Sequence, residues 1–192
     1  MAKIITENVG KFSQHYPKVA TIVTASSRGK DNAMAVAWHS SISPSPPLYG
    51  ISISPKRFTY QLIIESKEFG INFIPSEEAS FAAKVGGTSG KVIDKFERFN
   101  MEKEKPLKTQ VPILKDAYAA YECKLVDNKP YGDHIWVVGE IVAVHFFEEA
   151  FTSEGILALD KIKPLLYLGS EFYATTDKGS LLFLKRGISD KH

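Results

Sequence analysis

Cysteine and long apolar stretches are both scarce in this sequence. Cys123 is the single cysteine among 192 residues, so the chain can form no internal disulfide and has no Cys-x-x-Cys motif. The longest apolar segment, residues 135–147, is interrupted by polar residues and falls short of the roughly 20 apolar residues that a membrane-spanning helix needs. Residues 1–9 contain Lys3 and Glu7 and no apolar run, so no secretory signal is expected there. Together these features predict a cytoplasmic protein with no membrane partner.

An excess of charge of either sign is also lacking. The 24 basic and 22 acidic residues give a net charge of +2, which argues against a nucleic-acid partner but permits a local basic pocket. Glycine (13 residues) and proline (10 residues) are near their average abundance, which excludes collagen-like and low-complexity chains. The length predicts one domain, residues 1–192, large enough to form a core without disulfides.

The familiar catalytic and nucleotide-binding motifs are missing. The sequence has no G-x-G-x-x-G. Around the glycine run at residues 86–90, Val85 and Val92 occupy the two positions where a Walker loop needs Gly and Ser or Thr. His134 and His145 are eleven positions apart, which places them on opposite faces of a strand. No metal site is therefore expected.

The first half of the chain is dominated by strand patterns. β-branched or alternating segments predict strands at residues 18–26, 32–39, 48–54 and 69–74. The prolines of residues 43–47 predict an irregular loop there. Helices are expected at residues 55–66, after Ser76 as capping residue, and briefly near 91–99. With no strand–helix–strand rhythm, the pattern favours a mainly β fold, an antiparallel β-barrel with added helices, over a doubly wound nucleotide fold.

The second half contains a long predicted hairpin. Residues 117–126 and 135–147 are expected to pair across a connection at 127–133. The longer strand is apolar on both faces, so we expect a cover on each face, and a second subunit is one candidate for it. Residues 159–184 predict one more strand or helical turn, followed by a basic tail.

One predicted helix start carries charges of unexpected sign. Lys56 and Arg57 fall in the first turn of the helix at residues 55–66, where the helix dipole makes each cation unfavourable by about 0.3–1 kcal/mol. Free backbone N–H groups, these two cations and the hydroxyls of Ser54 and Thr59 would bind a phosphate. Two solvated basic side chains are the open alternative.

Small side chains occupy one face of two predicted strands. They are Ala33, Ala35 and Ala37 in one strand and Gly50, Ser52 and Ser54 in the other. Such faces admit either a packed helix or a planar ring close to the backbone. Trp38, at the end of its strand, is either a wall of such a site or a core residue. His134 is either a site residue or a structural turn residue.

The ordered set of these segments resembles a known family. Residues 32–54, continuing through Arg57-Phe58-Thr59, resemble the flavin-reductase-like family of FMN-binding split barrels. Later landmarks follow in the same order: FGINF at 69–73, DKF at 94–96, VP at 111–112, GDH at 132–134 and YLG at 167–169. The chain is most similar to the flavoredoxin and ferric-reductase-like branch. One departure is Ala35, where many members have threonine.

The resemblance implies a six-stranded antiparallel Greek-key split barrel and a homodimer with one FMN per protomer. It implies that the cofactor-binding residues are Asn32, Ala37, Trp38, His39, Ser40, Ser52, Ser54, Arg57, Thr59, Lys95, His134 and Tyr167. Among these, Ser52, Ser54, Arg57 and Thr59 would serve the ribityl and phosphate end. Lys95 and His134 would be catalytic, as charges that tune the flavin or approach the nicotinamide.

The implied activity is an oxidoreductase that transfers hydride from NADH or NADPH to FMN. The electrons would pass on to a flavin, a ferric chelate or a redox protein. The alternatives are a pyridoxamine-phosphate-oxidase-like enzyme and a flavin-binding or interaction module that reduces nothing. A further alternative is an interaction protein whose basic helix start binds no ligand.

Overall fold

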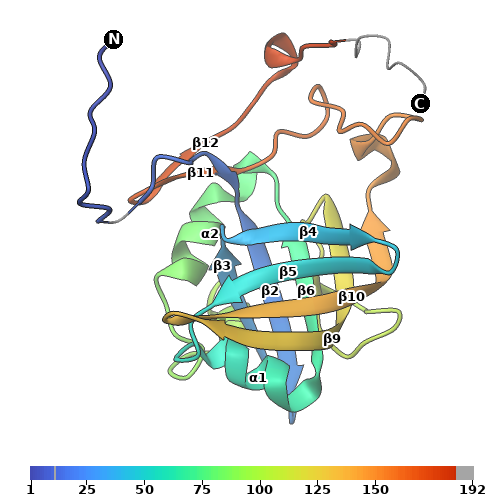
Figure 1. Ribbon diagram of the computed structural model, residues 1–192. Helices are drawn as coiled ribbons and strands as arrows, with labels where there is room; N and C mark the ends of the chain where they lie inside the picture. The colour runs from blue at the N-terminus through green and yellow to red at the C-terminus, as the bar shows by residue number, and fades with distance from the viewer. Residues whose placement is uncertain (11, 185–192) are drawn as a thin grey trace, which may run out of the picture.

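The chain is organised around one large antiparallel sheet in a computed structural model that describes residues 1–10 and 12–184. Within these residues the sheet has seven strands, and their spatial order is β3-β2-β6-β9-β10-β5-β4. Their bounds are β2 Thr21–Ser27, β3 Lys30–Val36, β4 His39–Pro44, β5 Pro47–Ile53, β6 Glu68–Phe73, β9 Ala119–Tyr131 and β10 His134–Phe146. Figure 1 shows β4, β5, β10 and β9 crossing in front of β2, β3 and β6. The predicted mainly β fold is confirmed.

Two small sheets and the helices complete the molecule. The small sheets comprise β1 (Lys18–Val19) with β11 (Leu166–Gly169) and β12 (Phe172–Ala174), and β7 (Lys103–Glu104) with β8 (Ile113–Leu114). The α-helices are α1 Phe58–Ser66, α2 Ala79–Gly86 and α3 Lys95–Arg98. The short 3₁₀ turns are η1 Ser76–Glu78, η2 Glu148–Ala150 and η3 Lys178–Ser180. No helix in the described part of the chain is long and apolar enough to cross a membrane.

The sheet has one more strand than the six expected, because the proline-rich segment is not an irregular loop. His39–Pro44 forms β4, which pairs with β5 up to Pro44 opposite Pro47. β4 is the last strand of the sheet, and an edge strand tolerates proline because its outer N–H groups have no ladder partner to lose. Only residues 45 and 46 remain as the turn between the two strands.

The long hairpin is tighter than the sequence pattern predicts. β9 and β10 stay paired as far as Tyr131 opposite His134, so the expected connection at 127–133 shrinks to Gly132 and Asp133. Gly132 has a φ of 64°, a conformation that glycine adopts without strain and that a two-residue turn requires. This turn places His134 at the start of a long, regular strand.

Two expected helix starts are shifted. Helix α1 begins at Phe58, because Pro55, Lys56 and Arg57 form a separate turn in which the Arg57 N–H donates to the Ser54 carbonyl at 3.0 Å. Lys56 and Arg57 therefore precede the helix, and their expected placement in its first turn is wrong. Ser76 begins the 3₁₀ turn η1 and makes no capping bond, since its hydroxyl donates to Glu77.

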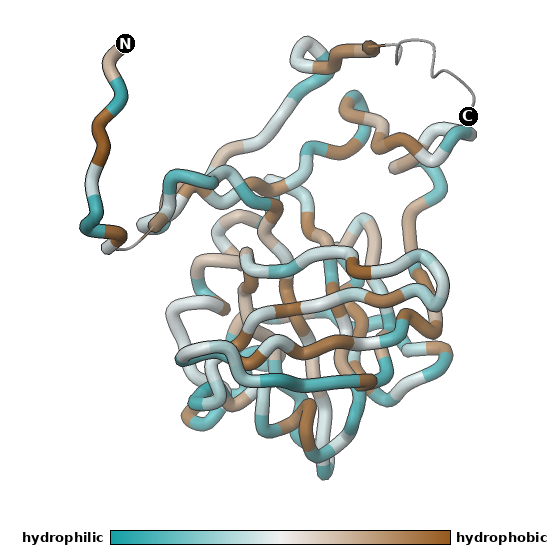
Figure 2. Tube along the Cα trace, in the orientation of Figure 1, coloured by the Kyte–Doolittle hydropathy of each residue, from teal (hydrophilic) through white to brown (hydrophobic). Residues whose placement is uncertain are grey.

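The core lies between the sheet and the helices that cover it. Ile51, Ile63 and Phe69 are completely buried on the α1 side, and Ile22, Val85 and Leu165 are buried below α2 and α3. Figure 2 shows apolar residues alternating with polar ones along the strands. Both ends of the described chain extend away from this body, and Ile4 and Leu182 on them are 92% and 79% exposed. The remainder of the expected basic tail, residues 185–192, lies outside the described residues.

Candidate functional site

Two adjoining cavities run along strand β3. The first, here called the basic pocket, has a volume of about 140 Å³ and is lined by Asn32, Met34, Ala35, residues 56–59, Val85, Gly86, residues 88–90 and Lys95. The second, the aromatic groove, has a volume of about 220 Å³ and is lined by Tyr16, residues 34–38, residues 52–54, Arg57, His134 and Tyr167. Met34, Ala35 and Arg57 line both cavities, so the two cavities are direct neighbours.

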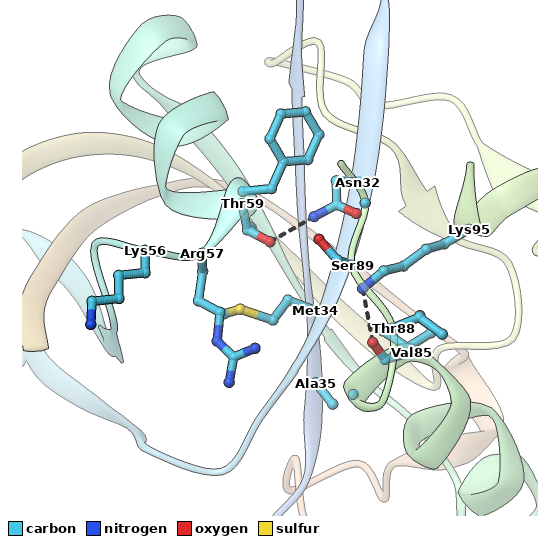
Figure 3. Close-up of a pocket in the computed structure, with 13 residues that line it drawn as sticks. Asn32, Met34, Ala35, Lys56, Arg57, Thr59, Val85, Thr88, Ser89 and Lys95 are labelled. Carbon is cyan, nitrogen blue, oxygen red and sulfur yellow. Dashed lines mark hydrogen bonds between the residues drawn. The ribbon is translucent and has the colours of Figure 1, made fainter. Parts of the chain in front are cut away.

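Lys95 is the buried cation of the basic pocket. It is the first residue of α3 and only 3% exposed, and its Nζ donates to the carbonyls of Ala33 and Val85, both at 2.8 Å. Figure 3 shows the bond to Val85. An ammonium has three N–H bonds, so one donor is left for the cavity. Burial and the neighbouring charge of Arg57 lower the pKa of Lys95 from 10.5 to about 8.

Arg57 is the second cation of this pocket and belongs to both cavities. It immediately precedes α1, and it lines both cavities together with Met34. Among the described residues, neither Arg57 nor Lys95 forms an ion pair with a carboxylate. Two neighbouring like charges that both face a cavity are relieved by a bound anion. Lys56 lies at the rim, and its amino group is turned away from Lys95 in Figure 3.

A buried amide and hydroxyl form another part of the pocket wall. Asn32 on β3 is 2% exposed, and its Nδ2 donates to Thr59 Oγ1 at 2.8 Å. Thr59, in the first turn of α1, is 1% exposed. The other end of the amide, Asn32 Oδ1, is buried and accepts no hydrogen bond from the described residues. An unpaired buried polar atom in a cavity wall indicates that the complete site has a further partner.

Aromatic rings enclose the second cavity. The ring centroids of Trp38 and His134 are 5.2 Å apart, and Trp38 Nε1 donates to Tyr16 Oη at 3.3 Å. The Tyr16 ring in turn meets Tyr167 edge-on at 5.4 Å. Since Ala35 and Ala37 line the cavity with single methyl groups, a flat ring can approach the β3 backbone there.

The turn between β9 and β10 fixes the orientation of His134. The Nδ1 of His134 lies 2.7 Å from Asp133 Oδ1, and this contact lowers the pKa of the Asp133 carboxyl. An ionised carboxylate only accepts hydrogen bonds, so Nδ1 carries the proton. The Nε2 atom is then the free ring nitrogen, which accepts a hydrogen bond in the neutral imidazole and donates one when the ring is protonated.

Comparison with known proteins decides the family. A family model described as flavin reductase like domain matches residues 13–176. The chain belongs to this family. The structure is similar to an FMN-binding protein from Thermus thermophilus solved with bound 1-cyclohex-2-enone, with 31% identity and a TM-score of 0.84 over 95% of this chain and 99% of that one. Solved relatives of the family have a split barrel, so the predicted resemblance and fold type are confirmed.

Two curated relatives extend the comparison. An uncharacterised protein from Aeropyrum pernix is 31% identical over 155 residues, which are 80% of this chain, and the match spans 58% of that protein's length. The reductase component of an FADH(2)-dependent resorcinol hydroxylase from a Rhizobium species is 25% identical over 177 residues, covering 91% of this chain and 90% of that protein.

The residues of this flavin reductase-like chain fit an FMN molecule. Arg57 and Lys95 have no carboxylate partner among the described residues, and a phosphate would supply the missing negative charge. The basic pocket is too small for a complete drug-sized ligand, but it has room for one end of such a ligand. The adjoining groove, with its alanine floor and aromatic walls, suits a flat ring system. The polar end and the flat part of FMN thus each have a matching cavity.

Most of the predicted cofactor-binding residues lie in these cavities. Asn32, Thr59 and Lys95 line the basic pocket, Arg57 lines both cavities, and Ala37, Trp38, Ser52, Ser54, His134 and Tyr167 line the aromatic groove. The two predicted catalytic residues are separated, since Lys95 lines the basic pocket and His134 the groove. The predicted small face of the second strand is partly filled, because a Cβ at Gly50 would lie 2.4 Å from the Trp136 ring.

His39 and Ser40 line neither cavity. The His39 ring is held between Tyr49 Oη, at 2.7 Å from Nδ1, and the Val19 carbonyl, at 2.8 Å from Nε2, and burial lowers its pKa. Ser40 belongs to β4 and its hydroxyl donates to the Ser41 carbonyl. The His39 side chain thereby joins β4 to β1 and β5, which explains why it is turned away from the site.

Tyr16, Met34 and Ser89 are among the lining residues that sequence reasoning missed. Tyr16 is distant in sequence and precedes no recognisable motif, so no pattern indicated it. Met34 alternates with the alanines of β3 and was expected on the opposite face. Ser89 lies in the glycine run at residues 86–90 and lines the basic pocket. This run could have indicated the site, although it does not match a Walker loop.

Proposed function

We propose that this chain is an FMN-dependent oxidoreductase of the flavin reductase type that takes hydride from NADH or NADPH. The observation that carries the proposal is the pair of cations, Arg57 and the buried Lys95, that face one small cavity with no carboxylate partner among the described residues. The family and the FMN-binding relative from Thermus thermophilus support FMN as the anion. The phosphate occupies the basic pocket and the ring system the aromatic groove.

The chain's own residues bind and orient the cofactor in this proposal. Arg57 and Lys95 neutralise the phosphate, and the hydroxyls of Ser52 and Ser54 are placed for the ribityl chain between the two cavities. Bound flavin supplies two-electron chemistry, and the chain itself needs no nucleophile for it. Trp38 and Tyr167 line the groove together with the alanines and limit the access of water.

His134 lies beside the Trp38 ring in the groove. Held by Asp133, it offers Nε2 to a polar edge of a bound ring, and in its protonated form it stabilises negative charge there. Lys95 acts differently from the sequence-based expectation in this scheme. Its Nζ is tied to two carbonyls of the basic pocket, so we assign it to phosphate binding rather than to tuning of the ring.

The electron acceptor we favour is a free flavin that leaves for a separate oxygenase. The relative from Rhizobium, named as a reductase component, supports this choice over a ferric chelate or a redox protein. A flavin-binding module without reductase activity is the second candidate, because the open aromatic groove would hold a ring equally well without a nicotinamide site.

A homodimer is part of the proposal. Val144 and Phe146 are two positions apart on β10, on the same face of the strand, and are 53% and 59% exposed. These exposed apolar side chains support a protein partner for this face of β10, and a second copy is the expected one. Light scattering after size-exclusion chromatography should give twice the chain mass, and a monomer would contradict the expectation.

Two measurements on the purified protein test the proposed function. Added FMN should be retained and give a visible flavin absorbance band, and anaerobic addition of NADH or NADPH should bleach this band. A protein that takes up no FMN would overturn the flavin proposal. FMN uptake without bleaching by either nicotinamide would favour the binding-module alternative.

A further inference from the structure

The walls of the aromatic groove come from two separate parts of the fold. Trp38 belongs to the main sheet, since it lies between β3 and β4 and its carbonyl accepts a hydrogen bond from the Ser52 N–H on β5 at 2.8 Å. Tyr16 and Tyr167 are carried by the small sheet, because Tyr16 precedes β1 and Tyr167 lies on β11. The width of the groove therefore depends on how the small sheet is attached to the main sheet.

His39 attaches β1 to the main sheet immediately beside Trp38. It is the first residue of β4, and its Nε2 lies 2.8 Å from the carbonyl oxygen of Val19 on β1. Val19 is paired with Leu166 on β11, the residue before Tyr167. The described residues form no other side-chain hydrogen bond to β1. This contact thus joins the strand after Trp38 to the pair of strands that carries the other two rings.

Tyr49 determines which ring nitrogen of His39 carries the proton. A carbonyl only accepts hydrogen bonds, so Nε2 must be protonated to bind Val19. Nδ1 is then the acceptor of a neutral ring, and the Tyr49 hydroxyl, 2.7 Å away, donates to it. Tyr49 is only 6% exposed, and its ring meets Phe73 and Tyr121 edge-on at 6.2 and 5.5 Å. The neutral imidazole therefore has both nitrogens satisfied and a fixed orientation.

Protonation of this imidazole would disturb the contact. Both nitrogens of an imidazolium are donors, so the buried Tyr49 hydroxyl would lose its acceptor. Lys18 on β1 adds a like charge, Phe73 on β6 meets the ring with an uncharged edge, and no carboxylate of the described residues pairs with His39. Burial lowers the pKa of His39 from 6.5, and Lys18 adds to this shift although the bond to Val19 opposes it.

We propose that His39 is a positioning residue of the aromatic groove. Its side chain lines neither cavity, and it acts through the Val19 carbonyl on β1 and β11. In this way it holds Tyr16 and Tyr167 at a fixed distance from Trp38. The inference rests on the proposed function for the flavin ring that the groove receives, whereas the contact itself is tested without flavin.

Hydrogen exchange followed by mass spectrometry tests the contact in the ligand-free protein. His39→Leu should speed amide exchange in β1 and β11 at least about tenfold, because the bond to Val19 is lost. The sheet should loosen rather than unfold, since the bond from the Ser76 N–H to the Lys163 carbonyl remains. His39→Gln offers a donor again and should return exchange to within about threefold of the wild type. Unchanged exchange in His39→Leu, or equal acceleration in both variants, would overturn the proposal.

Thr109→Val is the matched control for a general loss of stability. It also removes one buried side-chain bond, from Thr109 Oγ1 to Glu122 at 2.8 Å, and Thr109 lines neither cavity. Exchange in β1 and β11 should stay within about twofold of the wild type in this variant. Acceleration there equal to that of His39→Leu would show a global effect and would overturn the proposal.

Two measurements on the wild-type protein apply even if His39→Leu fails to fold. Nitrogen NMR should show the Nε2–H tautomer for His39 at neutral pH, with its signal assigned by its absence in His39→Gln, and an Nδ1–H tautomer would overturn the proposal. As the pH falls below 6.5, the loosened state binds the proton better than the closed one, so protection of β1 and β11 should decline. The decline should be absent in His39→Gln, and identical profiles in the two proteins would overturn the proposal.

Reduction of bound FMN by NADH or NADPH tests the consequence for the groove. His39→Leu should slow this reduction about 3–10-fold in anaerobic stopped-flow mixing, with FMN affinity changed by less than about threefold, and His39→Gln should restore the rate. A wild-type rate in His39→Leu despite faster exchange would overturn the positioning role and leave the flavin function intact. Failure of the wild-type protein to bind FMN would instead contradict the proposed function, while exchange and NMR still decide the contact.

Discussion

The basic pocket and the aromatic groove adjoin each other but are built differently. Buried, hydrogen-bonded side chains fix the pocket: Lys95 is tied to two carbonyls and Asn32 to Thr59. Ring contacts hold the groove together, and Trp38 is still 37% exposed. Tyr16 comes from the segment before β1 and Tyr167 from β11, which lie outside the main sheet.

This difference follows from what each cavity has to recognise. A charged group gains most from donors that are already fixed in place, because their orientation then costs no entropy on binding. A flat ring gains from contact area, which several arrangements of aromatic side chains can supply. We therefore expect variants in the pocket to change affinity strongly and variants in the groove to change rate or specificity mildly.

The largest effect is expected from Lys95→Met. It removes the buried charge from the phosphate site, and FMN affinity should fall at least about 100-fold, as expected for the loss of a strong charge-assisted hydrogen bond of about 3 kcal/mol. Without ligand the unfolding temperature should move little, because relief of the desolvated charge opposes the loss of two hydrogen bonds.

The variant to compare with it is Arg57→Ala, at the exposed side of the same pocket. It should weaken FMN by about 10-fold or more through the same kind of bond, with no change in unfolding temperature. Calorimetric titration and thermal unfolding measure both quantities. Unchanged FMN affinity in both variants would contradict the assignment of the FMN phosphate to the basic pocket.

The pH dependence of FMN affinity sharpens the comparison. Because the pKa of Lys95 is lowered to about 8, the ammonium is lost from the empty pocket as the pH rises above this value. FMN affinity should begin to fall as the pH approaches 8 and should decrease at higher pH by at most about tenfold per pH unit. Riboflavin affinity should stay level over the same range, and a similar decline for riboflavin would contradict the role of Lys95.

The stability of the ligand-free protein should change with pH in the opposite direction. The folded state holds Lys95 with a pKa of about 8 instead of 10.5, so between these values the unfolded chain binds more protons. The free energy of unfolding therefore rises with pH in this window through Lys95. Lys95→Met should remove that part of the rise, and denaturant unfolding at pH 8 and pH 10 measures it.

How far the sequence predicts the site also differs between the two cavities. Asn32, Arg57 and Thr59 belong to one ordered stretch, so their grouping in the basic pocket could be anticipated. The helix start could not, because the turn at residues 55–57 depends on a backbone bond to Ser54 that no residue pattern shows. His39 had the right residue type and neighbours, yet its bonds to Tyr49 and Val19 turn it away.

The fold was predictable to a similar degree. Alternating and β-branched segments located the strands of the main sheet, since this period reflects burial on one face. The proline-rich strand β4 was not predictable, because only its place at the sheet edge makes its prolines harmless. The aromatic groove depends on contacts between Tyr16, Trp38 and Tyr167, which are far apart in the chain and carry no local signal.

A smaller effect is expected from His134→Ala in the groove. Losing one hydrogen bond at the ring edge should slow reduction of bound FMN by about 3–10-fold, while FMN affinity changes by less than about threefold. Anaerobic stopped-flow mixing with NADH or NADPH measures the rate in a single turnover. Asp133→Asn, which keeps the imidazole and alters only its partner, should have an intermediate rate. An unchanged rate of FMN reduction in His134→Ala would contradict a role of His134 in the site.

The smallest effect belongs to Tyr16→Phe. The variant keeps the ring that meets Tyr167 and loses only the 3.3 Å bond from Trp38 Nε1. Because this bond is long and Trp38 is partly exposed, we expect a change of about two- to threefold in KM for the nicotinamide and none in FMN affinity. Tyr173→Phe is the matched control, since that ring contacts Tyr167 from β12 and lines neither cavity. A Tyr16→Phe variant that loses FMN affinity as strongly as Arg57→Ala would mean that the groove is as finely fixed as the pocket, and the contrast between the two cavities would no longer hold.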